Sequence, residues 1–444
     1  MNIFNNTIRF GFICILCNLY SISLFSQQEN ESSLYAPNSY IVYPGNSISI
    51  PVQKAFGVWQ NIQTLKATAP DLSENVSAEL LWQDTPGLIS GVQVDDTSAS
   101  ENALINVTTN SKSGNAVVCV KVGNVIRWSW HIWVTDYLPD NQNIEYDTEG
   151  RRLTFMSMNL GAISWSANDH TSYGLLYQYG RKDPFPASKS DSLETNYSFG
   201  SDTIYDISNN ILNSTAEKVT AENNLANTIT NPLSFYFGNS ANVNDWYSVN
   251  DVHNDTLWSG TNGRKGIFDP SPEGWRVPSS DQIPADLPMV INDVFSMGGS
   301  RDYTDGSFFM TGNYGMYWSA TPNSPLAYYM FLSEPLTETQ SSHYRANGYA
   351  IRCIKDDGSV AGIVNMENSK SPVVVSSENK EITVLLQDNL YTGALVCVYN
   401  INGILLSKVP LNSSRTIVTS NVAPGIYFVR IYGAENFVTK ILVK

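Results

Sequence analysis

Residues 102–137 have the sequence NALINVTTNSKSGNAVVCVKVGNVIRWSWHIWVTDY, in which three runs of apolar and β-branched residues follow one another. The segments NSKSGN and VGN separate these runs and are rich in turn-forming residues. Short strands divided by turns at this spacing are typical of antiparallel β-sandwiches. The earlier segment SYIVYPGNSISIPV also alternates around a Pro-Gly turn. We therefore predict that residues 36–137 are all-β and form an immunoglobulin-like sandwich.

The segment WSWHIWV, residues 128–134, alternates between the two faces of a strand. Trp128, Trp130 and Ile132 share one face, and His131 lies on the other. A histidine in a strand can serve as a ligand or a general base. No second histidine, cysteine or carboxylate has the spacing of a partner, so we expect His131 to be a structural residue of the more polar face.

The beginning of the chain predicts export. Residues 1–26 contain one charged side chain, Arg9, followed by the apolar run FGFICILCNLYSISLF and the small residue Ser26. This order is typical of a secretory signal peptide. The run is interrupted by polar residues and is shorter than the ~20 apolar residues of a membrane span. We expect no transmembrane segment once the signal peptide is removed.

The composition of the 444-residue chain supports a multidomain exported protein. The formal net charge is −15 and charged residues make up 15% of the chain, fewer than in an average globular protein. A chain this acidic is not expected to bind nucleic acid. The cysteines that remain after signal removal, Cys119, Cys353 and Cys397, show neither a disulfide framework nor metal-ligand spacing.

The region 138–357 is expected to be an α+β domain with long loops. Two short helices are predicted, one over residues 172–180 (SYGLLYQYG) and one that begins at Ser279, where Ser279 and Gln282 fit a capping box. Strands are predicted at GMYWSAT, AYYMFLS and GYAIRCIK. Residues 358–372 are expected to be a linker.

The last part of the chain, residues 373–444, is again predicted to be β. The segments EITVLLQ, RTIVTS, GIYFVRIY and NFVTKILVK all have a strand pattern. The sequence NING at 400–403 lies between alternating apolar runs, which indicates a hairpin. We predict a second, smaller immunoglobulin-like sandwich here.

This C-terminal region resembles a known family. The elements VYNINGILL, VAPGIYFVRI and the terminal VTKILVK match the C-terminal sorting domain of the type IX secretion system of Bacteroidetes in order and spacing. The resemblance implies contact with the type IX secretion machinery and export across the outer membrane. It also implies a location at the outer-membrane surface or outside the cell, usually after the domain has been removed.

The central region resembles the Fibrobacter succinogenes major paralogous domain. The segments MNLGAIS, GLLYQYGRKDPF, IFDPSPEGWRVPSS, YWSATPN and GYAIRCIKD occur in the order of that family, over about residues 155–355. The resemblance implies a C-type-lectin-like fold without a general assigned activity. It also suggests that the preceding region, which ends in WSWHIWVTDY, is a β module that often accompanies this domain in surface proteins.

One position departs from that family. Ser271 stands where relatives usually carry a cysteine, which the resemblance pairs with Cys353. Such a crosslink would close a loop of roughly 80 residues and be worth about 4 kcal/mol. The tryptophans of the shared motifs, Trp275 and Trp318, are expected in the core, and Arg276 is expected to pair locally.

The sequence offers little sign of catalysis. Calcium-dependent lectins use Glu-Pro-Asn, whereas this chain has Glu334-Pro335-Leu336, and Leu336 has no oxygen ligand. Cys353 lies in an apolar strand pattern, which is typical of an inert thiol. We expect no catalytic residues, no metal and no cofactor.

Aromatic residues in a polar segment are the remaining candidate for a ligand site. The segment NDWYSVNDVHNDTLWSG contains Trp246, Tyr247 and Trp258 among asparagine and aspartate residues. Such rings can stack on sugars while the amides and carboxylates bind the hydroxyl groups. The alternative is that these rings fill the core of a loop-rich domain.

The sequence thus predicts a secreted, cell-surface protein that binds or adheres without catalysis. A glycan or a surface protein is its expected partner. One alternative is a fimbrial tip or accessory structural subunit, held by strand addition at an open sheet edge. The other is an enzyme that acts on polysaccharide.

Overall fold

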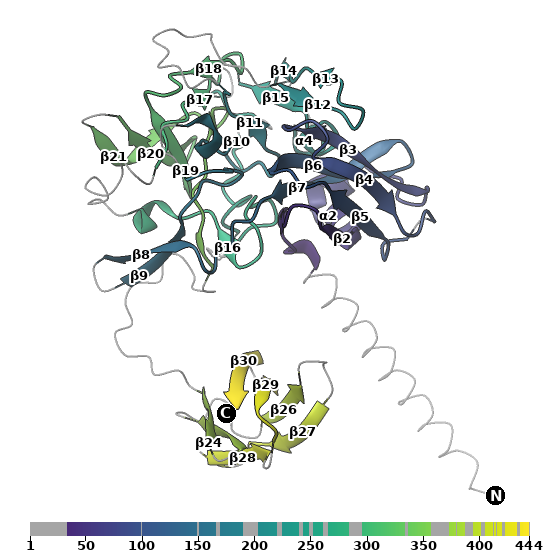
Figure 1. Cartoon of the computed structure of the whole chain (residues 1–444), viewed down its shortest axis with the longest axis vertical. Helices are drawn as coiled ribbons and strands as arrows, with labels where there is room; N and C mark the ends of the chain where they lie inside the picture. Colours follow the sequence, from purple (N-terminus) through teal and green to yellow (C-terminus); the bar gives the residue numbers. More distant parts are fainter. Residues whose placement is uncertain are drawn as a thin grey trace, which may run out of the picture. The chain divides into compact units, whose positions relative to one another are not determined.

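The computed structural model divides the chain into two compact units, Met1–Ala361 and Gly362–Lys444, which are described separately (Figure 1). The described residues are 33–98, 100–148, 151–165, 169–189, 203–219, 224–238, 243–247, 252–260, 265–283, 295–333, 336–356, 373–378, 380–386, 394–400, 405–411, 413, 415–419, 422–432 and 436–443. The predicted signal peptide and linker lie outside them.

Two sheets form the N-terminal part of the first unit. The larger sheet has the order β1 (Ser39–Val42), β7 (Val125–Val134), β6 (Gly114–Val122), β3 (Val76–Gln83), β12 (Ile204–Tyr205) and β13 (Ile211–Leu212). The smaller sheet has the order β2 (Ser47–Pro51), β5 (Leu104–Thr109) and β4 (Ile89–Val94). The predicted strands on either side of the Pro-Gly turn therefore join different sheets.

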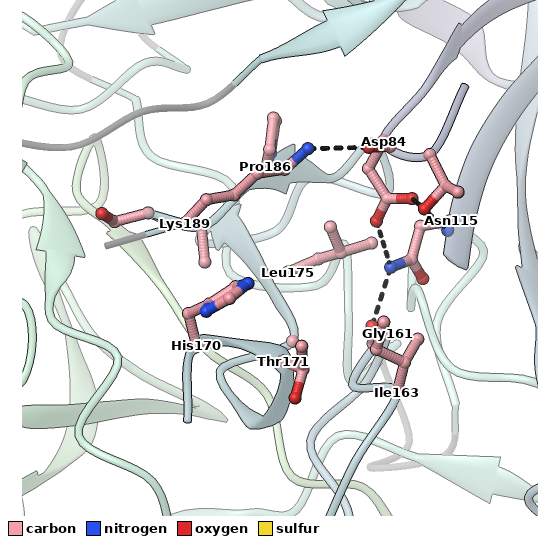
Figure 2. Close-up of a pocket in the computed structure, with 13 residues that line it drawn as sticks. Asp84, Asn115, Gly161, Ile163, His170, Thr171, Leu175, Pro186 and Lys189 are labelled. Carbon is pink, nitrogen blue, oxygen red and sulfur yellow. Dashed lines mark hydrogen bonds between the residues drawn. The ribbon is translucent and has the colours of Figure 1, made fainter. Parts of the chain in front are cut away.

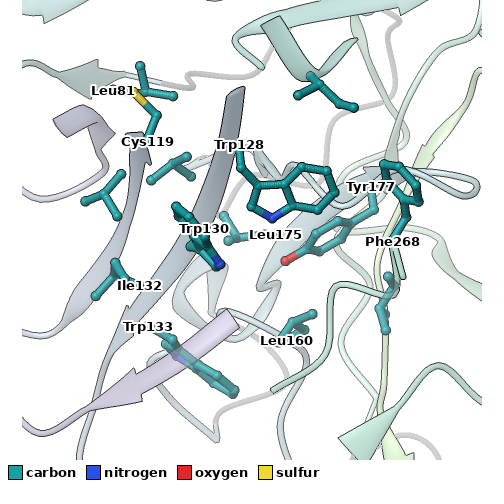
Figure 3. Close-up of a cluster of buried hydrophobic side chains, with 14 of the residues drawn as sticks. Leu81, Cys119, Trp128, Trp130, Ile132, Trp133, Leu160, Leu175, Tyr177 and Phe268 are labelled. Atoms are coloured by element: carbon teal, nitrogen blue, oxygen red, sulfur yellow. The ribbon is translucent and has the colours of Figure 1, made fainter. Parts of the chain in front are cut away.

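The strand β7 is buried on both faces. Its neighbours are β6, which runs antiparallel to it, and β1, which runs parallel to it. Figure 3 shows the rings of Trp128, Trp130 and Trp133 in the hydrophobic cluster around this strand. The face that carries His131 is thus covered by protein, and not exposed as a polar face.

A helix interrupts the region that was expected to be all-β. It is α2 (Gln53–Asn61), followed by the short α3 (Gln63–Lys66). The apolar residues Ala55, Phe56, Val58 and Trp59 repeat with the period of a helix and are all buried. The all-β prediction is therefore wrong for this segment, because its apolar residues have helical spacing although strand patterns lie on both sides of it.

The central region contains short strands joined by long loops. One sheet has the order β11 (Phe185–Pro186), β10 (Leu175–Gln178), β22 (Gly348–Tyr349), β17 (Ser300–Arg301) and β18 (Phe308–Phe309). A second has β16 (Trp275–Arg276), β23 (Ile354–Lys355), β9 (Arg151–Met156) and β8 (Asn143–Thr148), and a third has β19 (Gly315–Asn323), β20 (Leu326–Leu332) and β21 (Thr337–His343). The strands β14 (Thr215–Lys218) and β15 (Ser234–Phe237) form a pair, and α4 covers Asn224–Thr230.

The helix predicted over residues 172–180 is not formed. A 3₁₀ turn, η1 (His170–Ser172), precedes the strand β10, whose four side chains are all buried. Gly174 and Gly180, with φ of +75° and +83°, bound the strand. A fully buried strand has a continuous apolar run, and its periodicity does not distinguish it from a buried helix.

The second helix prediction is confirmed as a single 3₁₀ turn, η3 (Ser280–Gln282). The Gln282 Oε1 atom accepts from the Ser279 N–H at 3.0 Å, and the Gln282 N–H donates to the Ser279 carbonyl at 3.0 Å. The predicted strands in this region are confirmed as β19, β20, β22 and β23.

One hydrophobic cluster extends through the N-terminal and central parts of the first unit. Strand β12 of the central region pairs with β3 at Tyr205 and Gln83 and so extends the N-terminal sheet. The domain boundary expected at residue 137 stays a prediction. Across the described residues on either side of it, the two parts share a core.

The second unit has its own core between two sheets. These are β24 (Val373–Glu378), β25 (Glu381–Leu386) and β28 (Arg415–Thr419), and then β27 (Leu405–Pro410), β26 (Leu395–Asn400), β29 (Gly425–Tyr432) and β30 (Asn436–Val443). The antiparallel pair β26 and β27 confirms the predicted hairpin, whose turn lies outside the described residues. The chain is therefore a multidomain β-rich protein, as predicted.

Candidate functional site

The three aromatic residues expected to bind a ligand are buried. Trp246, Tyr247 and Trp258 are exposed by 1%, 8% and 1%, respectively. The indole N–H of Trp246 donates to the carbonyl of Tyr179 at 2.7 Å, and that of Trp258 donates to the carbonyl of Arg181 at 3.2 Å. A ring that stacks on a sugar needs an open face, so these rings do not form the expected platform. They fill the interior of the loop-rich region instead.

The structure places Ser271 against Cys353. The Cys353 thiol donates to the Ser271 hydroxyl over an Sγ–Oγ distance of 3.2 Å, and both side chains are fully buried. This contact brings together the two positions that the family resemblance pairs. Burial raises the pKa of the Cys353 thiol to about 12, so the sulfur stays protonated and is a poor nucleophile at neutral pH.

The other motif residues have structural roles. Trp275 and Trp318 are buried in the core, as expected. Arg276 forms the expected local pairs, because its Nη1 donates to Gln282 Oε1 at 2.8 Å and its Nε lies 3.6 Å from the Asp356 carboxylate.

Distant segments hold the Pro-rich loop that carries Ser271. The Asn38 amide donates to the Asp269 carbonyl at 2.7 Å, and the Ser39 hydroxyl donates to the Pro270 carbonyl at 2.5 Å. The Lys265 ammonium donates to the carbonyls of Ser271, Pro272 and Trp275. This loop is therefore fixed by hydrogen bonds to its backbone, without the disulfide.

A buried polar chain leads from the N-terminal segment toward the surface. Ser39 Oγ lies 2.9 Å from His131 Nδ1, and His131 Nε2 lies 2.9 Å from Asn115 Oδ1. Burial lowers the pKa of His131 to about 3, so the ring is neutral near pH 7. The Ser39 hydroxyl donates to the Pro270 carbonyl, and Ser39 and His131 are both buried. These hydrogen-bonded side chains therefore form a structural network. The prediction of a structural role for His131 agrees with this arrangement.

The polar chain ends at a pocket of about 170 Å³ (Figure 2). The pocket is lined by three separate parts of the first unit. Asn115 lies in β6 and Asp84 directly follows β3, while His170 and Thr171 come from the turn before β10 and Lys189 from the segment after β11. Figure 2 shows Asp84 and Asn115 on the side opposite His170.

Hydrogen bonds fix the polar side of this pocket. The Asn115 amide nitrogen donates to the Asp84 carboxylate and to the Gly161 carbonyl, each at 2.8 Å. The Lys189 ammonium donates to the Asp84 carbonyl at 2.7 Å. Burial raises the pKa of Asp84, while the bonds from Asn115 and the charge of Lys189 oppose that increase.

The floor of the pocket depends on a close approach at Gly161. This residue has a φ of +85°, and a Cβ atom built on it would lie 2.6 Å from the Leu175 side chain. The loop that follows is held by the Ile163 N–H, which donates to the Thr171 carbonyl at 2.8 Å. Only glycine allows this backbone to pass so close to β10.

Sequence reasoning missed this pocket. Its lining residues lie up to about a hundred positions apart and share no short motif. The one signal available was Gly161 within the segment MNLGAIS, since glycine is the residue that suits a turn with positive φ or a close approach of the backbone.

Two negative findings apply to the described part of the chain. It contains no group of three or more histidine, cysteine, aspartate or glutamate residues that could hold a metal ion. Among the helices described there, none is long and apolar enough to cross a membrane.

Comparison with known proteins identifies the end of the chain. Residues 378–444 match the family model of the secretion system C-terminal sorting domain. No curated protein matches the sequence. A solved structure of PorZ, described as an essential bacterial surface component of the type IX secretion system of Porphyromonas gingivalis, is similar at 19% identity with a TM-score of 0.15. That match covers 21% of this chain and 14% of the PorZ chain.

The sorting domain indicates the localisation of the protein. It indicates a cargo protein of the Bacteroidetes type IX secretion system, which is exported to the outer-membrane surface or the extracellular space. It also implies an interaction with the secretion machinery.

Proposed function

We propose that this exported chain is a non-catalytic binding protein of the cell surface, and that its ligand is a glycan held in the pocket between Asp84 and His170. The observation that carries the proposal is this pocket of about 170 Å³ in a protein with a sorting domain. Its lining offers a carboxylate, an amide, hydroxyl groups and an ammonium group, which suit the hydroxyl groups of a sugar.

The family resemblance is part of this proposal. We infer that the central region belongs to the Fibrobacter succinogenes major paralogous domain with a C-type-lectin-like fold, and that both β modules are immunoglobulin-like. The long loops and two-residue strands of the central region are compatible with a lectin-like domain. The contact between Ser271 and Cys353 also supports the correspondence with that family.

The lining of the pocket favours binding over hydrolysis. Glycosidases use two carboxyl groups on opposite sides of the scissile bond. Asp84 is the single acidic residue among the described residues that line this pocket. An uncharged sugar can bind there, whereas a pair of acids for hydrolysis is not assembled by these residues.

A glycan array with the intact exported protein tests this proposal. We expect binding to a restricted set of glycans, and we expect His170→Ala to weaken it because the imidazole lines the pocket. The matched control is Ile211→Ala, which changes an exposed residue outside the lining. The proposal fails if the protein binds no glycan, host protein or bacterial surface component.

An open sheet edge favours a second candidate function, that of a structural subunit of a surface assembly. Strand β21 lies at the edge of its sheet and pairs with β20, and its other side meets no strand among the described residues. An open edge of this kind can accept a strand from a partner chain. Pull-downs from surface extracts distinguish this candidate, and a strictly monomeric protein in those extracts counts against it.

A further inference from the structure

One tryptophan differs from all the others in its exposure. The chain has ten tryptophans, of which nine are buried. Trp165 is exposed by 53%. Tryptophan carries a large apolar surface and is highly buried on average, so an exposed one that is also held in place calls for an explanation.

The ring of Trp165 packs against a buried tyrosine. It meets the ring of Tyr137 edge to face, with centroids 5.6 Å apart and an interplanar angle of 89°. The Tyr137 hydroxyl is itself fixed, since it donates to the Gln142 carbonyl at 2.9 Å and accepts from the Ser157 N–H. Trp165 is therefore an exposed ring that packs on a hydrogen-bonded tyrosine.

The same loop carries Trp165 and forms part of the pocket. Ile163, which lines the pocket, lies two residues before Trp165. A chain of two residues spans at most about 7 Å. The hydroxyl oxygens of Thr171, another lining residue, and Ser164 lie 2.7 Å apart, and this contact ties the intervening residue to the pocket wall. The backbone of Trp165 therefore lies within about 7 Å of that of a lining residue, a separation that a ligand of two or more sugar rings can span.

The charges at the pocket indicate which sugars fit. Asp84 contributes a carboxylate and Lys189 an ammonium group, so neither sign dominates the described lining. Sugar hydroxyl groups both donate and accept, and they satisfy an acid and a base together. A strongly acidic sugar gains no net attraction from this mixed lining and is repelled by a protein whose net charge is −15.

We propose that Trp165 and the pocket form one site for an uncharged oligosaccharide, in which the pocket holds the terminal sugar and the indole stacks on the next ring. This inference rests on the proposed glycan binding and specifies its ligand class and its aromatic platform. The apolar face of a pyranose covers the indole, while the hydroxyl groups of its neighbour bond to the pocket.

Fluorescence quenching measures this site directly. Caesium ions quench exposed tryptophans and, as cations, are not repelled by an acidic protein. Because nine tryptophans are buried, the quenchable emission comes mainly from Trp165. We expect Trp165→Phe to remove most of this quenchable emission. The test uses the full chain with neutral trisaccharides (maltotriose, cellotriose, mannotriose and chitotriose) and with trigalacturonic acid as the acidic probe.

A neutral trisaccharide is expected to protect Trp165 from caesium, whereas trigalacturonic acid is not. Trp165→Ala is expected to weaken the binding of that trisaccharide on the order of tenfold, as for the loss of a central aromatic contact. Trp165→Tyr, which keeps an aromatic face, should retain most of the affinity. Tyr35→Ala is the matched control, since Tyr35 is an aromatic residue with 55% exposure outside the lining.

The outcomes separate the two proposals. If a trisaccharide binds but leaves the quenching of Trp165 unchanged and Trp165→Ala binds it equally well, this inference is overturned and glycan binding stands. If trigalacturonic acid alone binds and protects Trp165, the assignment to uncharged sugars is overturned. If neither these probes nor any glycan on the array binds, both proposals fail.

Discussion

At the scale of single residues, Ser271 and Cys353 form a weak hydrogen bond at the two positions that the family resemblance pairs as a disulfide. Their Sγ and Oγ atoms lie 3.2 Å apart, and 82 positions of sequence separate them. The Lys265 ammonium and the Asn38 amide hold the surrounding backbone instead. The fold thus relies on polar contacts to carbonyl groups where its proposed relatives have a crosslink.

We predict that Ser271→Cys forms a disulfide with Cys353 in an oxidising compartment. Closure of a loop of this length is worth up to about 4 kcal/mol, so the melting temperature should rise. Thermal melts with and without reductant measure the effect, and peptide mapping identifies the bond. Ser271→Ala is the control and should melt identically under both conditions. If mapping finds no such disulfide, the correspondence of this position with the family's cysteine is wrong.

A second prediction concerns His131. Burial lowers its pKa to about 3 in the folded protein, whereas an exposed histidine has a pKa of about 6.5. The unfolded chain therefore binds the proton more readily, and the free energy of unfolding decreases as the pH falls from about 6.5 to about 3.

Comparison of the wild-type protein with His131→Gln isolates this effect, because glutamine keeps a hydrogen-bonding side chain but does not titrate. Urea unfolding at several pH values should show that the wild-type protein loses a few kcal/mol more than the variant across this window. Parallel pH profiles for the two proteins would show that His131 is not the group responsible.

At the scale of elements, the turn η3 shows how one side chain can organise a loop. The Oε1 atom of Gln282 accepts from both the Ser279 N–H and the Arg276 guanidinium. It thereby connects the turn to β16, which pairs with β23 next to Cys353. The Ser279 hydroxyl also donates to this atom at 2.9 Å, so loss of the acceptor would remove three hydrogen bonds from buried donors.

We predict that Gln282→Ala lowers the free energy of unfolding by about 1–3 kcal/mol, the cost of leaving buried donors unsatisfied. Gln282→Glu keeps an acceptor beside Arg276 and should retain most of the stability. Denaturant titrations of both variants measure the difference. Equal losses in the two variants would mean that packing, and not the acceptor, accounts for the effect.

The elements also show what could be predicted from the sequence and what could not. The capped turn at Ser279 and the strands around Trp318 were predictable, because local caps and alternating patterns are encoded over a few residues. The strand β10 was not, because a fully buried run has no distinguishing period. The pocket could not be predicted for a different reason, because only the tertiary structure brings Asp84 and His170 to the same cavity.

At the scale of the whole molecule, the two units have separate hydrophobic cores. The sorting domain lies in the second unit, and the proposed binding site lies in the first. The sorting domain and the proposed binding site thus lie in parts of the chain that have separate hydrophobic cores.

We predict that removal of residues 373–444 stops export but leaves the first unit folded. The truncated protein should accumulate in the periplasm, because it lacks the sorting domain. Cell fractionation measures its location, and a thermal melt of the recovered protein should reproduce the transition of the first unit. Surface display of the truncated protein would contradict the prediction for export, and loss of the transition would contradict the independence of the cores.

The parallel pairing of β1 with β7 has a consequence for the order of folding. The residues of β1 leave the ribosome early, yet their partners on β7 follow 92 positions later, and the carbonyls that Asn38 and Ser39 bind follow 231 positions later. Contacts between such distant segments form slowly, since a long loop must close first. The first strand of the fold can therefore complete its contacts only after about residue 270 of the first unit has been synthesised.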